Sequence, residues 1–120
     1  MRPPLECLGD ISRRCDLIEQ RVGTLDRDSF LKGGPEVEAT IWSIVVIGEA
    51  ANAVDRQLQR RFGDFPWAGV IALRNVLNHQ YFQIRYDMIW RILAQDLPRI
   101  RGETARMIAV LSAEPEGSAS

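Results

Sequence analysis

Residues 41–51 constrain the fold more than any other part of the chain. Their sequence, IWSIVVIGEAA, is apolar on almost every side of a helix. A helix of that kind is central in a bundle or lies at an interface between subunits. The apolar stretch is interrupted by Glu49 and Asn52, and it is shorter than the ~20 residues that a membrane span needs. We therefore expect a soluble helical protein built around this segment.

Helical periodicity continues along most of the chain. Apolar residues recur at three- and four-residue spacing in the first segment, at Leu8, Ile11, Cys15, Ile18 and Val22. The predicted helices are residues 5–22, 26–31, 35–62, 66–79, 86–97 and, started or kinked by Pro98, 99–111. No run is typical of a strand. The fold class is therefore all-α, a four- to five-helix antiparallel bundle over residues 1–111, with residues 112–120 as a disordered tail.

The charge balance excludes a broad polycation but permits a local anion site. The chain has 120 residues and a formal net charge of −1, which argues against binding nucleic acid by bulk positive charge. The distribution is uneven, because residues 55–106 hold nine Arg and five acidic residues, a net +4, and both flanks are acidic. Charge that binds phosphate would therefore be local.

The cysteines and the N-terminus indicate a reducing compartment. No apolar core of a signal peptide follows Met1, so we expect a cytoplasmic protein without membrane association. Cys7 and Cys15 would lie ~12 Å apart along one helix, too far for a disulfide. With two separated Cys and one His there is no zinc signature, and we expect neither a metal site nor a cofactor.

Residues 74–82, RNVLNHQYF, are the candidate for chemistry. On a helix, Asn75 and His79 share one face, and Arg74 and Asn78 share an adjacent strip. RNA cleavage needs a group that moves protons and a positive group that stabilises the phosphorane, which suit His79 and Arg74. Because the chain has one His, an acid–base pair is easiest to build at the two-fold axis of a homodimer. From composition alone, the same residues are equally an ordinary solvated helix face.

The pattern Arg74-x4-His79-x-Tyr81, with Asn75 directly after the Arg, resembles the signature of HEPN ribonucleases, and most of all their HepT-like toxin branch. Other elements of that branch occur in the same order and cover roughly residues 38–100. They are residues 47–50 (IGEA), 65–67 (FPW), the aromatic pair 81–82, Trp90, and residues 97–98 (LP).

The resemblance implies a helical homodimer whose motif helices face each other across a cleft. It implies metal-independent endoribonuclease activity on RNA, with tRNA as one candidate substrate, Arg74 and His79 as catalytic residues and Asn75 as a supporting group. It also implies a toxin–antitoxin operon. The antitoxin of this branch is a minimal nucleotidyltransferase, which binds the toxin and can transfer AMP to the motif tyrosine, here Tyr81. Bulk and negative charge added there would repel RNA phosphates.

Several alternatives stay open. The chain could be a non-catalytic HEPN module that pairs with a nucleotidyltransferase or binds nucleotide, or a helical scaffold. Tyr81 could be a packing residue. Glu49, inside an apolar helix, could form a structural ion pair with an Arg of the motif helix, or could orient Arg74 and line the cleft.

The aromatic and basic residues outside the motif also have more than one interpretation. Three tryptophans are expected to anchor a core or an interface more often than to stack on bases: Trp42, Trp67 and Trp90. Four arginines form a solvated face, a surface that tracks RNA, or a contact for an acidic antitoxin: Arg56, Arg60, Arg61 and Arg85.

Overall fold

The computed structural model describes residues 2–76 and 85–115, and every regular element among them is helical. This confirms the all-α prediction. The helices are α1 (Pro4–Val22), α2 (Arg27–Leu31), α3 (Pro35–Ala53), α4 (Arg56–Arg61), α5 (Trp67–Ala72), α6 (Tyr86–Arg91) and α7 (Leu97–Ala113). A 3₁₀ turn, Leu73–Asn75, extends α5, and a π-helical turn, Ile92–Asp96, joins α6 to α7. No helix in the described part of the chain has the length and apolarity required to cross a membrane.

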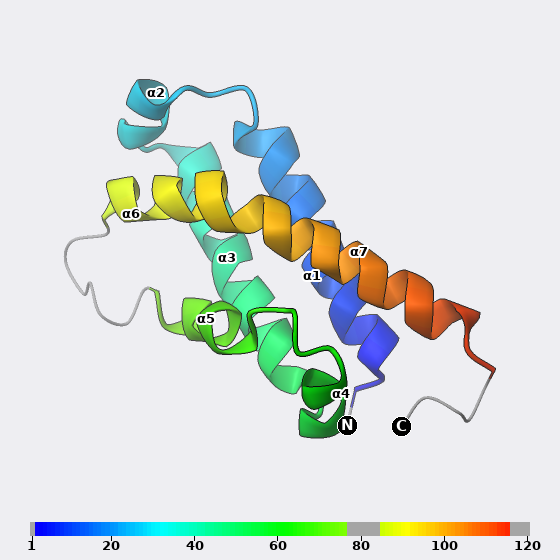
Figure 1. Cartoon of the computed structure of the whole chain (residues 1–120). Helices are drawn as coiled ribbons and strands as arrows, with labels where there is room; N and C mark the ends of the chain where they lie inside the picture. Colours follow the sequence, from blue (N-terminus) through cyan, green and yellow to red (C-terminus); the bar gives the residue numbers. More distant parts are fainter. Residues whose placement is uncertain (1, 77–84, 116–120) are drawn as a thin grey trace.

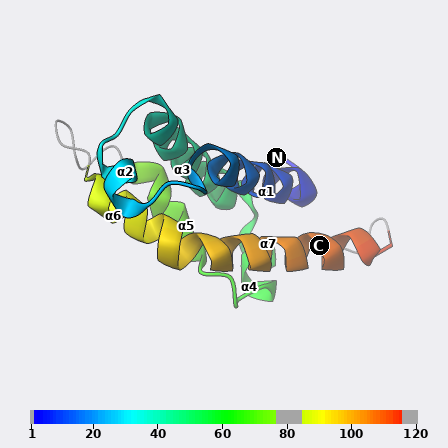
Figure 2. The ribbon, with the colours of Figure 1, turned by 90° about the horizontal axis from the view of Figure 1, so that it is seen from above.

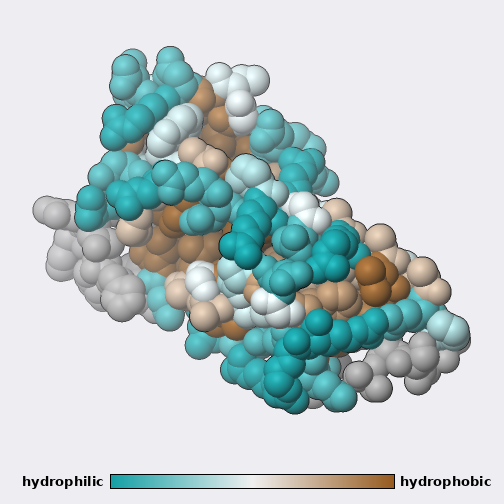
Figure 3. All heavy atoms as spheres, viewed as in Figure 1, coloured by the Kyte–Doolittle hydropathy of each residue, from teal (hydrophilic) through white to brown (hydrophobic). Residues whose placement is uncertain are grey.

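Three long helices enclose the core. Helices α1 and α3 lie side by side and run in opposite directions, and α7 crosses them (Figure 1). Seen from above, α7 lies on one side of the α1–α3 pair (Figure 2). Polar side chains cover the outer surface of α6 and α7, and apolar atoms are visible beneath them (Figure 3). The core therefore lies between these layers, and α3 is buried along much of its length.

The spacing of apolar residues predicts the buried face of α1 correctly. Leu8, Ile11, Cys15, Ile18 and Val22 are all buried, as is Cys7. Both cysteines are free thiols, which agrees with the expectation that they form no disulfide with each other. Burial raises the pKa of the Cys15 thiol to about 11, so this group stays protonated near neutral pH. Both cysteines therefore pack as small apolar side chains.

The single helix predicted over residues 35–62 is wrong, because the chain breaks after Ala53. Val54 has an extended conformation, and the carboxylate of Asp55 accepts a hydrogen bond from the Leu58 amide at 2.9 Å, which caps α4. The Gln59 side-chain amide donates to the Val54 carbonyl at 2.8 Å and so satisfies a carbonyl that a continuous helix would have used. The N-capping preference of Asp outweighs helical periodicity here.

Pro98 lies in the first turn of α7, as predicted. A proline ring clashes with the carbonyl four residues earlier in a regular helix, which here belongs to Ala94. The chain avoids the clash with the wider π turn, in which the Leu97 amide donates to the Ile92 carbonyl. Helix α7 then continues to Ala113, two residues into the predicted tail.

The turn between α2 and α3 holds the start of α6. Gly33 has φ +74°, in the left-handed region, and the Tyr86 ring lies directly against it: a Cβ placed on Gly33 would be 2.9 Å from Tyr86 Cε2. Phe30 and Trp90 add a ring contact between α2 and α6, with centroids 5.4 Å apart. These contacts hold the start of α6 against α2 and the turn that follows α2.

Replacing Gly33 by Ala should lower the free energy of unfolding by about 1–2 kcal/mol. Alanine disfavours the positive φ at this position, and its Cβ would clash with the Tyr86 ring. Gly102→Ala is the matched control, since no atom lies within 4 Å of a Cβ at that position in α7. It should raise the free energy of unfolding by up to about 1 kcal/mol through helix propensity. Urea unfolding followed by circular dichroism measures both. Equal stability of the two variants would contradict the assignment.

Candidate active site

The backbone of Arg74 lies directly against Gly48 of α3. A Cβ built on Gly48 would be 2.3 Å from the Arg74 nitrogen and 3.0 Å from its Cα and Cβ. The absence of a side chain at residue 48 therefore lets the 3₁₀ turn approach α3 at backbone distance. The contact joins two segments singled out in the sequence, residues 47–50 and the start of the motif.

The motif segment is helical up to Asn75, and Val76 caps this turn as the last described residue before residue 77. Helix α5 ends at Ala72 and tightens into the 3₁₀ turn Leu73–Asn75, which closes with a hydrogen bond from the Val76 amide to the Leu73 carbonyl at 3.1 Å. Val70 and Val76 are buried. The regular α-helical spacing assumed for residues 66–79 therefore does not hold at Arg74 itself.

The start of α5 is fixed by a turn rich in aromatic residues. The indole nitrogen of buried Trp67 donates to the Phe62 carbonyl at 3.0 Å, and its ring lies 4.4 Å from that of Phe65. Arg99 of α7 donates to the Asp64 carbonyl at 2.8 Å. Sequence reasoning missed Arg99 as a support for the motif, because a contact across 35 residues leaves no local pattern. It also did not single out Phe62, which takes part through its backbone carbonyl, a group that every residue type has.

The structure places two of the six predicted site residues beside each other at the surface of the bundle. Arg74 and Asn75 are both half-buried. No ion pair joins Arg74 to any residue within 2–76 or 85–115. Asn78, His79 and Tyr81 lie outside the described residues, so their predicted roles stay predictions.

Glu49, the remaining site residue, is exposed, which corrects the expectation that it lies buried in an apolar helix. No hydrogen bond or ion pair connects it to Arg74. Among the residues that the structure describes, one face of α3 carries two exposed side chains, Trp42 and Glu49, with the half-buried Val45 and Val46 between them. This outer stripe of α3 consists of Trp42, Val45, Val46 and Glu49, spaced by three and four residues. Trp42 is 56% exposed, which is unusual for so large an apolar side chain.

The arginines of the +4 region are mostly engaged. Arg61 forms an ion pair with Glu114 and Arg85 one with Asp87, and Arg56 donates to the Gln59 side chain. Hydrogen bonding to Arg61 holds the pKa of the Glu114 carboxyl below its usual value. Arg61 also lies over the Phe62 ring, 5.0 Å from its centroid. Of the four arginines predicted to form a basic surface, Arg60 alone has no such contact within the described residues.

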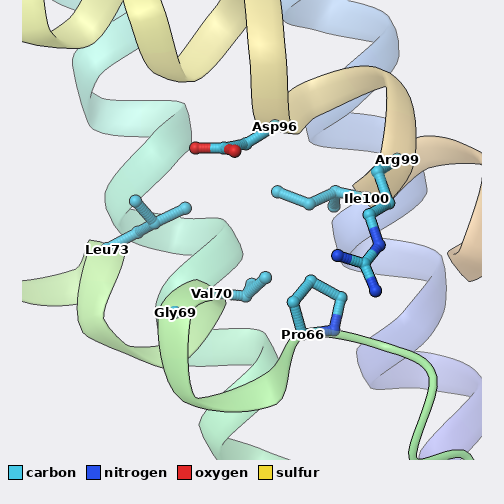
Figure 4. A pocket seen from close by; sticks show the side chains of 7 residues that line it. All are labelled: Pro66, Gly69, Val70, Leu73, Asp96, Arg99 and Ile100. Carbon is cyan, nitrogen blue, oxygen red and sulfur yellow. The ribbon is translucent and has the colours of Figure 1, made fainter.

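A small cavity lies between α5 and the start of α7 (Figure 4). Its volume is about 140 Å³, and it is lined by Pro66, Gly69, Val70, Leu73, Asp96, Arg99 and Ile100. Small-molecule sites usually enclose about 300–1,000 Å³, so this space is too small for a nucleotide. Within the described ranges, no group of three His, Cys, Asp or Glu residues could hold a metal ion.

Comparison with known proteins identifies the family. The model of the ribonuclease HepT-like family matches residues 11–107. The chain belongs to the HepT-like ribonuclease family. This match runs from α1 into α7 and includes both Gly48 and the whole motif, and it agrees with the resemblance carried by residues 47–50 and 74–82.

Relatives in this family have similar lengths. "Putative RNase MJ1380" of Methanocaldococcus jannaschii is 30% identical, over 80% of this chain and 88% of that protein. "Probable ribonuclease HepT" of Thermococcus cleftensis is 26% identical, over 83% and 91%. "Putative RNase TTE0752" of Caldanaerobacter subterraneus is 24% identical, over 90% and 96%. No solved structure is significantly similar to the chain. The family and these relatives support ribonuclease activity.

Proposed function

We propose that this HepT-like protein is a metal-independent endoribonuclease toxin of the cytoplasm. The observation that carries the proposal is the position of Arg74: within a chain of a ribonuclease family, it is half-buried, unpaired among described acidic residues, and seated by its backbone on α3. A guanidinium held in this way can donate two aligned hydrogen bonds to a phosphate.

The chemistry follows from the residue types. His79 removes the proton from the RNA 2′-hydroxyl or donates one to the leaving 5′-oxygen, since histidine is the side-chain type most often used for such proton transfers. Arg74 stabilises the charge that develops on the phosphorane. Asn75 and Asn78 orient the phosphate or a base, and the exposed Glu49 lies on the same helix as Gly48, toward which the Arg74 backbone packs.

Purified protein should cleave single-stranded RNA in the presence of EDTA, and Arg74→Ala or His79→Ala should each lower the rate by at least about 10²-fold. Arg60→Ala, which removes an exposed arginine of α4, should leave the rate unchanged. Gel electrophoresis of labelled RNA gives the rates. Undiminished cleavage by His79→Ala would contradict the mechanism. A wild type that cleaves no RNA but binds a nucleotidyltransferase would favour the alternative of a non-catalytic module.

The active form is proposed to be a homodimer with its cleft at the interface. One His per chain supplies one proton-transfer group, whereas strand cleavage uses two, and a two-fold axis supplies the second. The outer stripe of α3 is the proposed surface for this contact, because Trp42 is 56% exposed and its apolar neighbours Val45 and Val46 are only partly buried within the described residues. The stripe lies on α3, the helix against which the Arg74 backbone packs. Joining two stripes would therefore bring the two motifs toward one interface.

Trp42→Glu should convert the dimer into a monomer and remove RNA cleavage, because a charge at the interface centre is desolvated without a partner. Leu5→Glu is the matched control, since Leu5 is 42% exposed on α1, away from the outer stripe. It should stay dimeric and active. Size-exclusion chromatography with light scattering measures the mass. A dimeric and fully active Trp42→Glu protein would reject this interface.

The proposed antitoxin is a minimal nucleotidyltransferase that also modifies Tyr81. In that step the Tyr81 phenolic oxygen attacks the α-phosphorus of ATP, pyrophosphate leaves, and the phenolic proton passes to solvent or a base. The product is a phosphodiester-linked AMP, which adds negative charge and bulk seven residues after Arg74 in the sequence. Charge of that sign opposes binding of an RNA phosphate near Arg74.

Incubation with ATP and the nucleotidyltransferase from the neighbouring reading frame should raise the mass of the protein by one or more AMP units and inhibit cleavage. Tyr81→Phe should show no increase in mass. Tyr86→Phe is the control: it removes the hydroxyl of the other tyrosine, leaves Tyr81 intact, and should be modified as the wild type is. Intact-protein mass spectrometry measures the change. An increase that persists in Tyr81→Phe would assign the modification to another residue.

A further inference from the structure

The contact between Gly48 and Arg74 leaves no room for a side chain. Cβ atoms in proteins essentially never lie within 3.0 Å of another non-bonded heavy atom, and a Cβ on Gly48 would lie 2.3 Å from the Arg74 nitrogen. The obstacle is the backbone of residue 74, which cannot rotate away as a side-chain end could. Any side chain at residue 48 must therefore displace either α3 or Arg74.

Displacement falls on the Arg74 side. Residues on both sides of Gly48 in α3 are buried against the core, among them Ile44, Ile47 and Ala51. Closely packed interiors resist shifts of whole helices. The 3₁₀ turn at Arg74 is three residues long and half-buried, and its anchors are the buried side chains of Val70 and Val76. Moving this short turn therefore disrupts fewer buried contacts than moving α3.

We propose that Gly48 is a positioning residue for RNA cleavage, and that its lack of a side chain sets the place from which the Arg74 guanidinium reaches the scissile phosphate. This inference rests on the proposed role of Arg74. A guanidinium moves with the Cα that carries it, and two hydrogen bonds to a phosphorane are sensitive to small changes of position. Misplacement by about 1 Å costs on the order of 10²-fold in rate.

Gly48→Ala tests the proposal against two matched replacements. Gly69 is an exposed residue of α5 at the edge of the small cavity and Gly102 is an exposed residue of α7, and a Cβ on either would have no atom within 4 Å. In folded protein, Gly48→Ala should lower kcat by about 10- to 100-fold with little change in KM, since the loss is confined to the transition state. Gly69→Ala and Gly102→Ala should keep both constants.

A double-mutant cycle separates positioning from general packing. If Gly48 acts through Arg74, then Gly48→Ala should have no further effect on the residual cleavage rate of Arg74→Ala. A contribution to packing alone would lower the melting temperature and leave kcat per folded molecule unchanged, or would lower the rate equally in both backgrounds. Either of these results would overturn the proposal.

Two further measurements keep the outcome decisive. If Gly48→Ala folds poorly, the kinetics are repeated in the Gly102→Ala background, in which helix propensity adds stability. Failure of the double variant to fold would also reject the proposal, because the proposal requires the chain to accommodate an alanine at residue 48 by moving Arg74. If the wild type cleaves no RNA, the proposed function fails by itself. Crystal structures of wild type and Gly48→Ala then show whether the Arg74 Cα moves, and an unmoved Cα would reject the positioning role.

Discussion

The approach of the Arg74 backbone to Gly48 is the constraint on which the rest of the site depends. It joins the most buried helix of the protein to the segment that carries the motif, and it exists because residue 48 has no side chain. The surrounding structure supports this contact from several sides. Trp67 hydrogen-bonds the Phe62 carbonyl at the start of α5, and Arg99 reaches the neighbouring turn from α7. A separate contact, between Tyr86 and Gly33, holds the start of α6.

Helix α3 has two tasks, and its composition reflects both. Its inner faces contact α1 and α5 and supply much of the core. Its outer stripe carries an exposed tryptophan in a chain that otherwise exposes few large apolar groups among its described residues. A helix that is apolar on almost every side is typical of a bundle centre or of an interface between subunits. The low net charge of the chain is compatible with the proposed interface between two copies.

Ion pairs neutralise much of the positive charge that the sequence carries. Most arginines with described contacts serve neighbouring acidic groups: Arg2 bonds Asp10 and Glu6, Arg101 bonds Asp16, and Arg106 bonds Glu103. Hydrogen bonding to Arg2 holds the pKa of the Asp10 carboxyl below its usual value. Exposed pairs of this kind contribute little to stability, but they neutralise charge locally. The net charge of +4 in residues 55–106 therefore overstates the basic surface that this region presents. Arg74, Arg60 and Arg91 have no acidic partner among the described residues, and of these three Arg74 alone is half-buried and packs by its backbone on Gly48.

The sequence by itself determined the all-helical class, the buried positions of α1, the place of Pro98 and the family, because each depends on local spacing or on an ordered set of motifs. The tertiary structure decided the rest. It ended α3 at Ala53, because the Asp55 cap and the Gln59 bond to Val54 outweigh periodicity. It turned Glu49 outward, because burial depends on which neighbours cover a helix face, and hydropathy of the segment cannot show this. It also brought Gly48 and Arg74, 26 residues apart, into contact. A missing side chain has meaning only beside the backbone that fills its space, and only the folded chain places that backbone.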